Sequence, residues 1–155
     1  MGNLGRKVLQ RTVRMKVTGF DGRERNFNFS KYFVRADDRK ARSNLHKRAR
    51  KILQEFFPRD RLYEEVPLPG SSQGSVRNIL RADFFLPSRF LVVEVHGRQH
   101  YEFVRHFHGN KLDFFRSQKR DRDKTEWCEI NPVNLVILKY SDTDDEWKKQ
   151  LAACS

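Results

Sequence analysis

Apolar and polar positions recur in two patterns over the first third of the chain. Asp21-Gly22 interrupts an alternating stretch at residues 13–29, which is typical of a tight β-hairpin. From residue 41 to residue 57, apolar positions recur at three- and four-residue spacing. Ser43 can cap a helix over these residues and Pro58 can end it, so the pattern predicts an amphipathic helix.

The remaining pattern predicts three strands, a polar helix, an apolar strand and a last helix, at residues 62–66, 78–86, 90–95, 111–128, 134–140 and 142–153. A turn-rich segment precedes the second strand, and Pro87-Ser88-Arg89 joins it to the third, so these strands should form a meander. The order is hairpin, then αβββαβ, then α. It predicts an α/β or α+β fold with a mixed sheet.

The chain is long enough to bury one core, and no repeat or linker interrupts its 155 residues. We therefore expect a single domain. Residues 1–40 would form a hairpin appendage, 41–140 the core that carries the candidate chemistry, and 141–155 a C-terminal helix.

The formal net charge is +12, with basic residues spread along the whole chain. Such a surface suits a polyanion, and nucleic acid is the first expectation because phosphate contacts supply most non-specific affinity. No stretch approaches the ~20 apolar residues of a spanning helix, and no signal-peptide core is visible. We expect a soluble, intracellular protein that binds DNA, with no membrane and no small-molecule cofactor, and we expect Cys128 and Cys154 to be structural.

The candidate DNA contacts are basic residues of the first helix and of the loops near the candidate site, namely Lys47, Arg48, Lys51, Arg98 and Arg105. Arg50 is expected on the same basic face of the helix.

Two acids stand where core strands usually carry valine. With the turn at 87–89, Asp83 falls opposite Val93 or Glu94, and cross-strand neighbours have Cβ atoms ~4.5–5.5 Å apart. Two carboxylates that close repel each other, and Mg²⁺ would remove the conflict while leaving positions for phosphate oxygens. Asp83 and Glu94 are thus candidate metal ligands. The alternative is an acid paired with a nearby arginine on the open face of a ribbon.

Two histidines follow the second acid directly. His96 should point to the same face as Glu94, and Gly97 would let Gln99 and His100 turn back over the acids. His100 is the candidate base, since imidazole exchanges protons near neutral pH. The alternative is a structural histidine beside a solvated one.

The polar helix places Asp121, Lys124 and Thr125 on one face. Asp121 could orient His100 or a metal-bound water, and Lys124 could meet the scissile phosphate. The alternative is a solvated helix with internal ion pairs.

These residues resemble a known family. The order αβββαβ, with Ala82-Asp83, then ten residues, then Glu94-Val95-His96, resembles the core of the PD-(D/E)XK, or restriction-endonuclease-like, nucleases. The Gln99-His100 pair after Gly97, with Arg120-Asp121 and the WCEIN segment at 127–131, is similar to the very-short-patch-repair-like branch. That branch includes homing endonucleases with an E-D-x-H-D active-site pattern.

The resemblance covers roughly residues 43–140. It implies Mg²⁺-dependent phosphodiester hydrolysis, with Mn²⁺ as a substitute. Asp83 would be a metal ligand, Glu94 the second acid, His100 the catalytic histidine and Asp121 the trailing acid, with Gln99 beside them.

Two positions depart from the family pattern. His96 stands where the wider family has lysine, so that role is lost, moved to Lys124 or taken by His100. The branch's early glutamate falls near His46, and Glu65 is the candidate to supply it instead.

The strand with Glu64-Glu65 and the turn at Pro67 also resemble small tailed-phage nucleases of this branch that act in head completion. This likeness implies a phage-encoded enzyme that processes packaged DNA, with head or portal proteins as partners. Two further hypotheses remain, a homing or mismatch-repair endonuclease and a non-enzymatic basic DNA-binding assembly protein.

Overall fold

A computed structural model describes residues 14–33, 43–72 and 79–154. The elements are β1 (Arg14–Thr18), β2 (Glu24–Asn28), the 3-10 helix η1 (Ser30–Tyr32), α1 (Asn44–Phe56), β3 (Tyr63–Pro67), β4 (Arg81–Leu86), the 3-10 helix η3 (Pro87–Arg89), β5 (Leu91–His96), the 3-10 helix η4 (Arg98–His100), α2 (Arg105–His108), α3 (Lys111–Ile130), β6 (Asn134–Lys139) and α4 (Asp144–Ala153).

The hairpin and the three-strand meander have the connections that the sequence predicts. β1 and β2 form an antiparallel hairpin, and the second sheet has the order β3-β4-β5-β6. Its first two pairings are antiparallel, whereas β5 and β6 are parallel, with α3 as the crossover between them. The mixed α/β class is thus confirmed.

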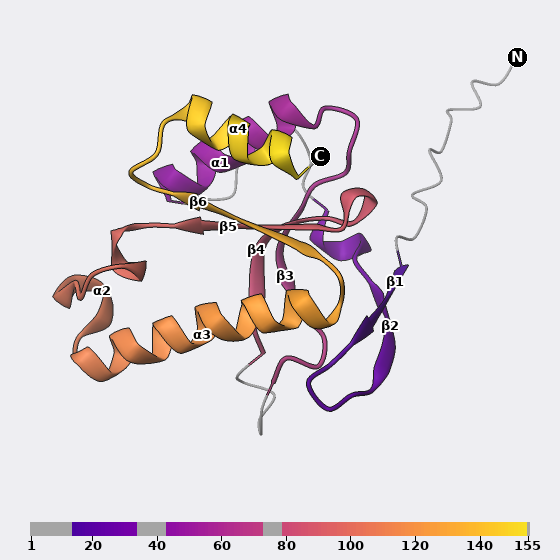
Figure 1. Cartoon of the computed structure of the whole chain (residues 1–155), viewed down its shortest axis with the longest axis horizontal. Helices are drawn as coiled ribbons and strands as arrows, with labels where there is room; N and C mark the ends of the chain where they lie inside the picture. The colour runs from indigo at the N-terminus through magenta and orange to yellow at the C-terminus, as the bar shows by residue number, and fades with distance from the viewer. Residues whose placement is uncertain (1–13, 34–42, 73–78, 155) are drawn as a thin grey trace, which may run out of the picture.

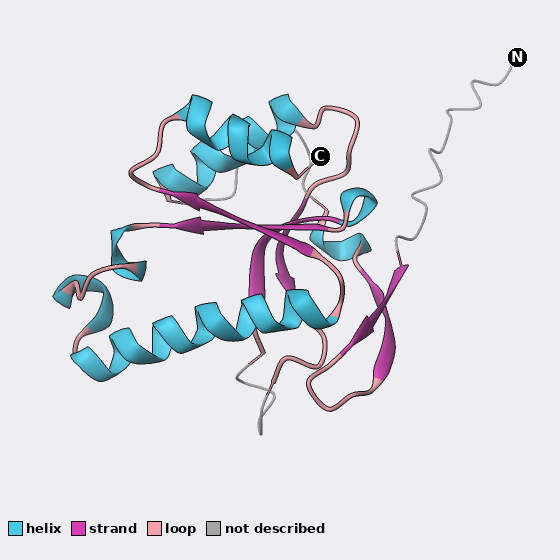
Figure 2. Ribbon diagram, viewed as in Figure 1, coloured by secondary structure: helices cyan, strands magenta, loops and turns pink. Residues whose placement is uncertain are grey.

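Helices cover both faces of the larger sheet. α1 and α4 lie on one face, and α3 runs along the other (Figure 1). Figure 2 shows the same layers by secondary structure, with the hairpin beside the C-terminal end of α3. Among the described residues, no helix is long and apolar enough to cross a membrane.

Strand alternation divides the core into two clusters. Phe84 and Val93 face α1 and α4, where they pack with Trp147. Phe85 and Val92 face the opposite side and join a cluster that contains Trp127 of α3. Asp83 and Glu94 lie two residues from Phe85 and Val92 along their strands, so alternation turns both acids toward α3.

The hairpin is built into this second cluster. Val17 and Phe29 are each only 1% exposed, and both pack in it. The Asn131 side chain follows α3 and bonds both backbone groups of Thr18, accepting from its N–H at 2.6 Å and donating to its carbonyl at 2.9 Å. The predicted appendage therefore contributes to the core.

Caps explain where the helices begin. The Ser43 side chain accepts a hydrogen bond from His46 N at 3.2 Å, which confirms the predicted cap of α1. Thr143 and Glu146 form a reciprocal capping box at the start of α4. The sequence pattern did not predict the short helices η1, η4 and α2, and the expected starts at residues 13, 41 and 78 lie outside the described residues.

Candidate active site

Asp83 and Glu94 meet across the β4–β5 pair. Phe84 pairs with Val93, so the next step of this register sets Asp83 opposite Glu94. The Asp83 Oδ2 atom accepts a hydrogen bond from Val95 N at 2.8 Å, and Glu94 is buried, at 2% exposed. Of the two predicted partners for Asp83, the structure selects Glu94.

The pair carries an electrostatic conflict. Burial and the neighbouring Asp83 carboxylate raise the pKa of Glu94 well above its usual range. Lys124 of α3 opposes this effect, since its Nζ lies 3.1 Å from Glu94 Oε1. Burial acts to lower the pKa of Lys124, but Glu94 and Asp83 outweigh it and raise that pKa. Among the described residues, Glu94 Oε1 nevertheless has no hydrogen-bond partner of good geometry.

His100 and Asp121 form a second pair beside the acids. The backbone turns at Gly97, where a Cβ would lie 2.4 Å from Gln99 Oε1, so the absence of a side chain makes room for this amide. His100 Nδ1 then lies 2.9 Å from Asp121 Oδ2. Burial acts to raise the pKa of Asp121, but the hydrogen bond and charge of His100 lower it.

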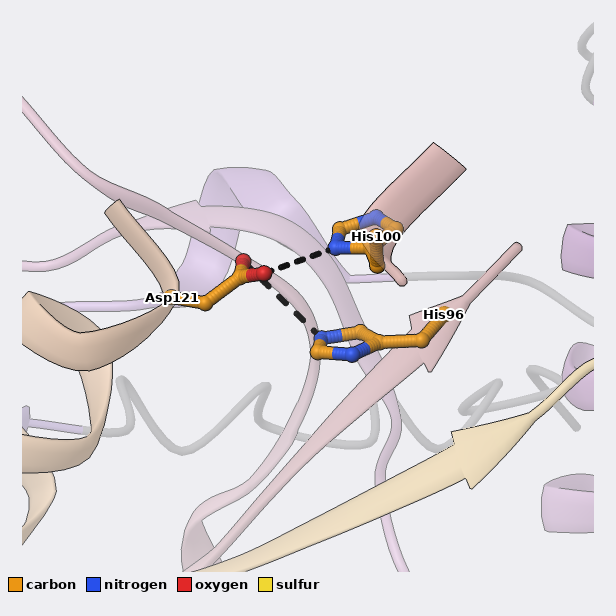
Figure 3. A group of neighbouring side chains, drawn as sticks. All are labelled: His96, His100 and Asp121. Carbon is orange, nitrogen blue, oxygen red and sulfur yellow. Dashed lines mark hydrogen bonds and ion pairs between the residues drawn. The ribbon is translucent and has the colours of Figure 1, made fainter. Parts of the chain in front are cut away.

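His96 lies directly against this pair. Its ring stacks on that of His100, with centroids 3.9 Å apart and planes at 11°. Burial, followed by the neighbouring His100, lowers the pKa of His96 to about 4, so this buried ring is neutral near pH 7. Figure 3 shows both imidazoles directed at the Asp121 carboxylate.

The acid pair, Lys124 and His100 border one pocket of about 320 Å³. Its lining consists of Ser43, Leu45, His46, Asp83, Glu94, Val95, Gly97, Gln99, His100 and Lys124. Five of the predicted catalytic residues thus line the same pocket. Asp121 is not among the lining residues, but it makes a hydrogen bond with His100, which is. Ser43, Leu45 and His46, at the start of α1, also line the pocket.

Glu65 does not join them. It is exposed, with a backbone φ of 50°, and is not among the residues that line the pocket. Its neighbour Glu64 turns inward instead, where Arg50 donates to it at 2.8 and 3.0 Å and His46 Nε2 bonds it closely. Burial opposes the effect, but these partners lower the pKa of Glu64 to about 2.

The predicted DNA contacts divide into open and engaged side chains. Lys47, Lys51 and Arg105 are exposed, and exposed Arg98 pairs with Glu102 at 2.6 Å. Arg48 is engaged within the fold. It donates to Asp144 at 2.6 Å and to the Asp142 carbonyl at 2.7 Å, and it stacks over Trp147 with the guanidinium 3.7 Å from the ring centroid. Arg50, expected on the same open face, is buried against Glu64.

The donor set fits a hard divalent cation at the acids. Asp83 and Glu94 supply carboxylate oxygens from two neighbouring strands, and the buried acceptor Glu94 Oε1 has no well-aligned donor within the described ranges. Mg²⁺ is commonly held by one or two carboxylates with water and phosphate oxygens completing its shell.

Sequence reasoning missed the Glu64 cluster and the contacts of His96 with Asp121 and His100. The first had a signal in the i, i+4 spacing of His46 and Arg50, which places them on one helix face. The contact of His96 with Asp121 had none, because it depends on how α3 crosses the sheet.

Comparison with known proteins finds viral relatives of part of the chain. The sequence is similar to Uncharacterized protein 307L of Invertebrate iridescent virus 6, 42% identical over 65 residues, or 42% of this chain and 33% of the relative. It is also similar to Uncharacterized protein 033L of Invertebrate iridescent virus 3, 37% identical over 49% of this chain and 42% of the relative. A third is Uncharacterized protein 094L of Frog virus 3, 29% identical over 54% of this chain and 55% of the relative.

The chain therefore matches between about a third and just over half of the length of these curated relatives. No family model matches the sequence, and no solved structure matches it either.

Proposed function

We propose that the protein is a Mg²⁺-dependent DNA endonuclease of the restriction-endonuclease-like type. One observation carries the proposal. Asp83, Glu94, Lys124, Gln99 and His100 line a single pocket, although they come from two strands, a 3-10 helix and a crossover helix. An acid pair that needs a cation, a lysine and a histidine directed by an acid are the groups that phosphodiester hydrolysis requires.

In this proposal the chain's own groups have separate roles. His100 takes the proton from the attacking water, because Nδ1–H donates to Asp121 and the lone pair of Nε2 remains for the pocket. Lys124 stabilises negative charge at the phosphate and, between substrates, balances Glu94. Asp83 and Glu94 hold the cation, which when bound neutralises phosphate charge and makes water more acidic.

The lysine reaches this pocket from α3, whereas the wider family carries it on the strand, at the position of His96 here. The sheet order β3-β4-β5-β6, with its last pair parallel and helices on both faces, also supports the proposal. The viral source of the relatives supports a virus-encoded enzyme. A role in head completion, with head or portal partners, stays a prediction.

Nicking of supercoiled plasmid tests the function. The wild-type chain should nick DNA with Mg²⁺ or Mn²⁺ and not with EDTA. Asp83→Asn should remove nicking, because a neutral amide holds the cation poorly, and His100→Ala should slow it by about 10²–10⁴-fold. Asp123→Asn is the control, since Asp123 lies on α3 and pairs with Lys119 rather than with the pocket.

DNA binding measured on the same samples separates the two classes of function. All four proteins should bind DNA, so that loss of nicking reports chemistry alone. If every protein binds and none nicks across supercoiled, linear, branched and single-stranded DNA, the nuclease proposal fails. The basic, non-enzymatic DNA-binding protein then takes its place.

A further inference from the structure

His96, His100 and Asp121 form a group of potential metal ligands beside the acid pair. One ligand atom from each lies within 4.8 Å of the other two. The three side chains come from β5, η4 and α3, and they converge on one point (Figure 3). His96 is buried, while His100 and Asp121 are partly open toward solvent.

Only one of the two histidines makes a direct hydrogen bond to Asp121. His96 Nε2 lies 4.0 Å from Asp121 Oδ1, which is too long for a hydrogen bond, while His100 Nδ1 lies 2.9 Å from Asp121 Oδ2. Ligand atoms about 2.0–2.1 Å from a tetrahedral zinc ion lie roughly 3.3 Å apart. The two nitrogens approach different oxygens of Asp121, and the three ligand atoms spread over up to 4.8 Å, so the side chains must draw together around an ion. The stacked rings, whose planes lie at 11°, must also tilt for both lone pairs to meet the same ion.

The surroundings of His96 also suit a metal ligand. Its other ring nitrogen, Nδ1, lies 3.3 Å from the Tyr101 hydroxyl. A histidine that binds a metal through one nitrogen usually donates the N–H of the other to an oxygen, which fixes the tautomer and the ring direction. Tyr101 thus leaves the lone pair of Nε2 pointing toward Asp121.

We propose that His96, His100 and Asp121 bind a transition metal ion of the Zn²⁺ class, at a site distinct from the Asp83–Glu94 pair. Two imidazoles and one carboxylate select borderline metals such as Zn²⁺, whereas two carboxylates suit Mg²⁺. Lys124, on the same helix as Asp121, is paired with Glu94, so part of its charge is already balanced there.

Occupation of this site would switch the nuclease off, a consequence that rests on the proposed function. Zn²⁺ at Nδ1 of His100 displaces the proton that this nitrogen donates to Asp121. The proton moves to Nε2, so the imidazole presents an N–H to the pocket instead of a lone pair. His100 can then no longer accept a proton from water.

Metal binding tests the site without reference to cleavage. The chain is stripped with EDTA, and Zn²⁺ is titrated in competition with a chromophoric chelator, with 10-fold excess Mg²⁺ present. Wild type and Asp123→Asn should bind one Zn²⁺ alike. Tyr101→Phe should weaken binding by about 10-fold, as loss of a hydrogen bond behind a ligand does, and His96→Phe by more. Equal binding by all four proteins, or none by wild type, overturns the site.

Cobalt provides a readout on the unaltered chain, so that a variant which fails to fold does not decide the result. Co²⁺ should give visible absorption typical of four- or five-coordinate nitrogen and oxygen ligands. A thiolate charge-transfer band would instead assign the metal to Cys128 or Cys154 and overturn the proposal.

Nicking assays then test the switch. Zn²⁺ should inhibit Mg²⁺-dependent nicking by wild type, and Tyr101→Phe should need about 10-fold more Zn²⁺ for the same fractional inhibition. If Zn²⁺ binds as expected but nicking continues, the switch is wrong and the site stands. If no protein nicks DNA at all, the proposed nuclease fails, while the titration still decides whether the metal site exists.

Discussion

At the scale of single residues, the charge balance of the pocket depends on Lys124. Its ammonium group lies against a carboxylate that burial and a second carboxylate both destabilise. Lys124 and a bound cation would therefore both stabilise the ionised acids, since each supplies positive charge beside the same carboxylates. Their effects on stability should be coupled.

Lys124→Met should reveal this coupling. In EDTA the variant should lose up to about 3–5 kcal/mol of unfolding free energy, because a buried carboxylate loses its partner. Mg²⁺ should then raise the melting temperature of the variant more than that of wild type. Lys119→Met, which removes an exposed partner of Asp123, should cost less than about 1 kcal/mol. Equal Mg²⁺ stabilisation of wild type and Lys124→Met would contradict the coupling.

The sequence predicted residues whose position follows from spacing. Asp121 and Lys124 share a helix face by their three-residue interval, and that prediction is confirmed by their contacts with His100 and Glu94. Glu64 and Glu65 could not be separated in this way. Adjacent strand residues face opposite sides, and only packing against α1 shows that Glu64 is the inner one.

At the scale of elements, the Glu64 cluster joins α1 to β3. Glu64→Gln should cost about 3–5 kcal/mol at pH 7, since Arg50 and His46 lose a buried charged partner. Glu65→Gln is the matched control and should change stability by less than about 0.5 kcal/mol. Urea unfolding measures both variants.

The same cluster sets a pH dependence. The pKa of Glu64 falls from 4.5 to about 2 on folding, so the carboxylate stabilises the fold fully above pH 4.5. That contribution is lost as pH falls from 4.5 toward 2. The difference in stability between wild type and Glu64→Gln should therefore shrink over this range. A difference that stays constant would exclude Glu64 as the source of the pH dependence.

Whether a segment is a helix or a strand could be predicted from its hydrophobic periodicity. The pairing of strands that lie far apart in the sequence could not. The Asp21-Gly22 turn and the Pro87 turn fix two antiparallel pairs, because short loops allow little else. The parallel β5–β6 pair and its register depend on how a 20-residue helix crosses the sheet. No local pattern contains that information, so the approach of His96 to Asp121 on α3 was not predicted.

At the scale of the whole molecule, the net charge of +12 predicts a binding surface without locating it. The fold shows which basic residues of α1 are available to bind DNA. Arg48 and Arg50 pair with carboxylates within the fold. Lys47 and Lys51 are exposed on α1, and residues at the start of this helix line the pocket.

Salt dependence of DNA binding should distinguish these charges. In an Asp83→Asn background, chosen because the proposed nuclease would not cleave with this substitution, replacing Lys47 and Lys51 by alanine should reduce the slope of log affinity against log salt by about 2. Replacing the exposed pair Lys148 and Lys149 on α4 should leave the slope unchanged, because α4 does not line the pocket. If both double replacements reduced the slope equally, the DNA would not be bound specifically along α1.

The parallel pairing of β6 has a consequence for how the protein is made. All side chains of the pocket lie at or before Lys124, so a ribosome has added each of them before it reaches β6. Yet α3 is the crossover between β5 and β6, and β6 shares with β5 the ladder that carries Glu94. A nascent chain that stalls at residue 130 would hold every side chain of the pocket without the strand pairing that arranges them. The pocket would therefore take its final arrangement only after Lys139, the last residue of β6, has been added.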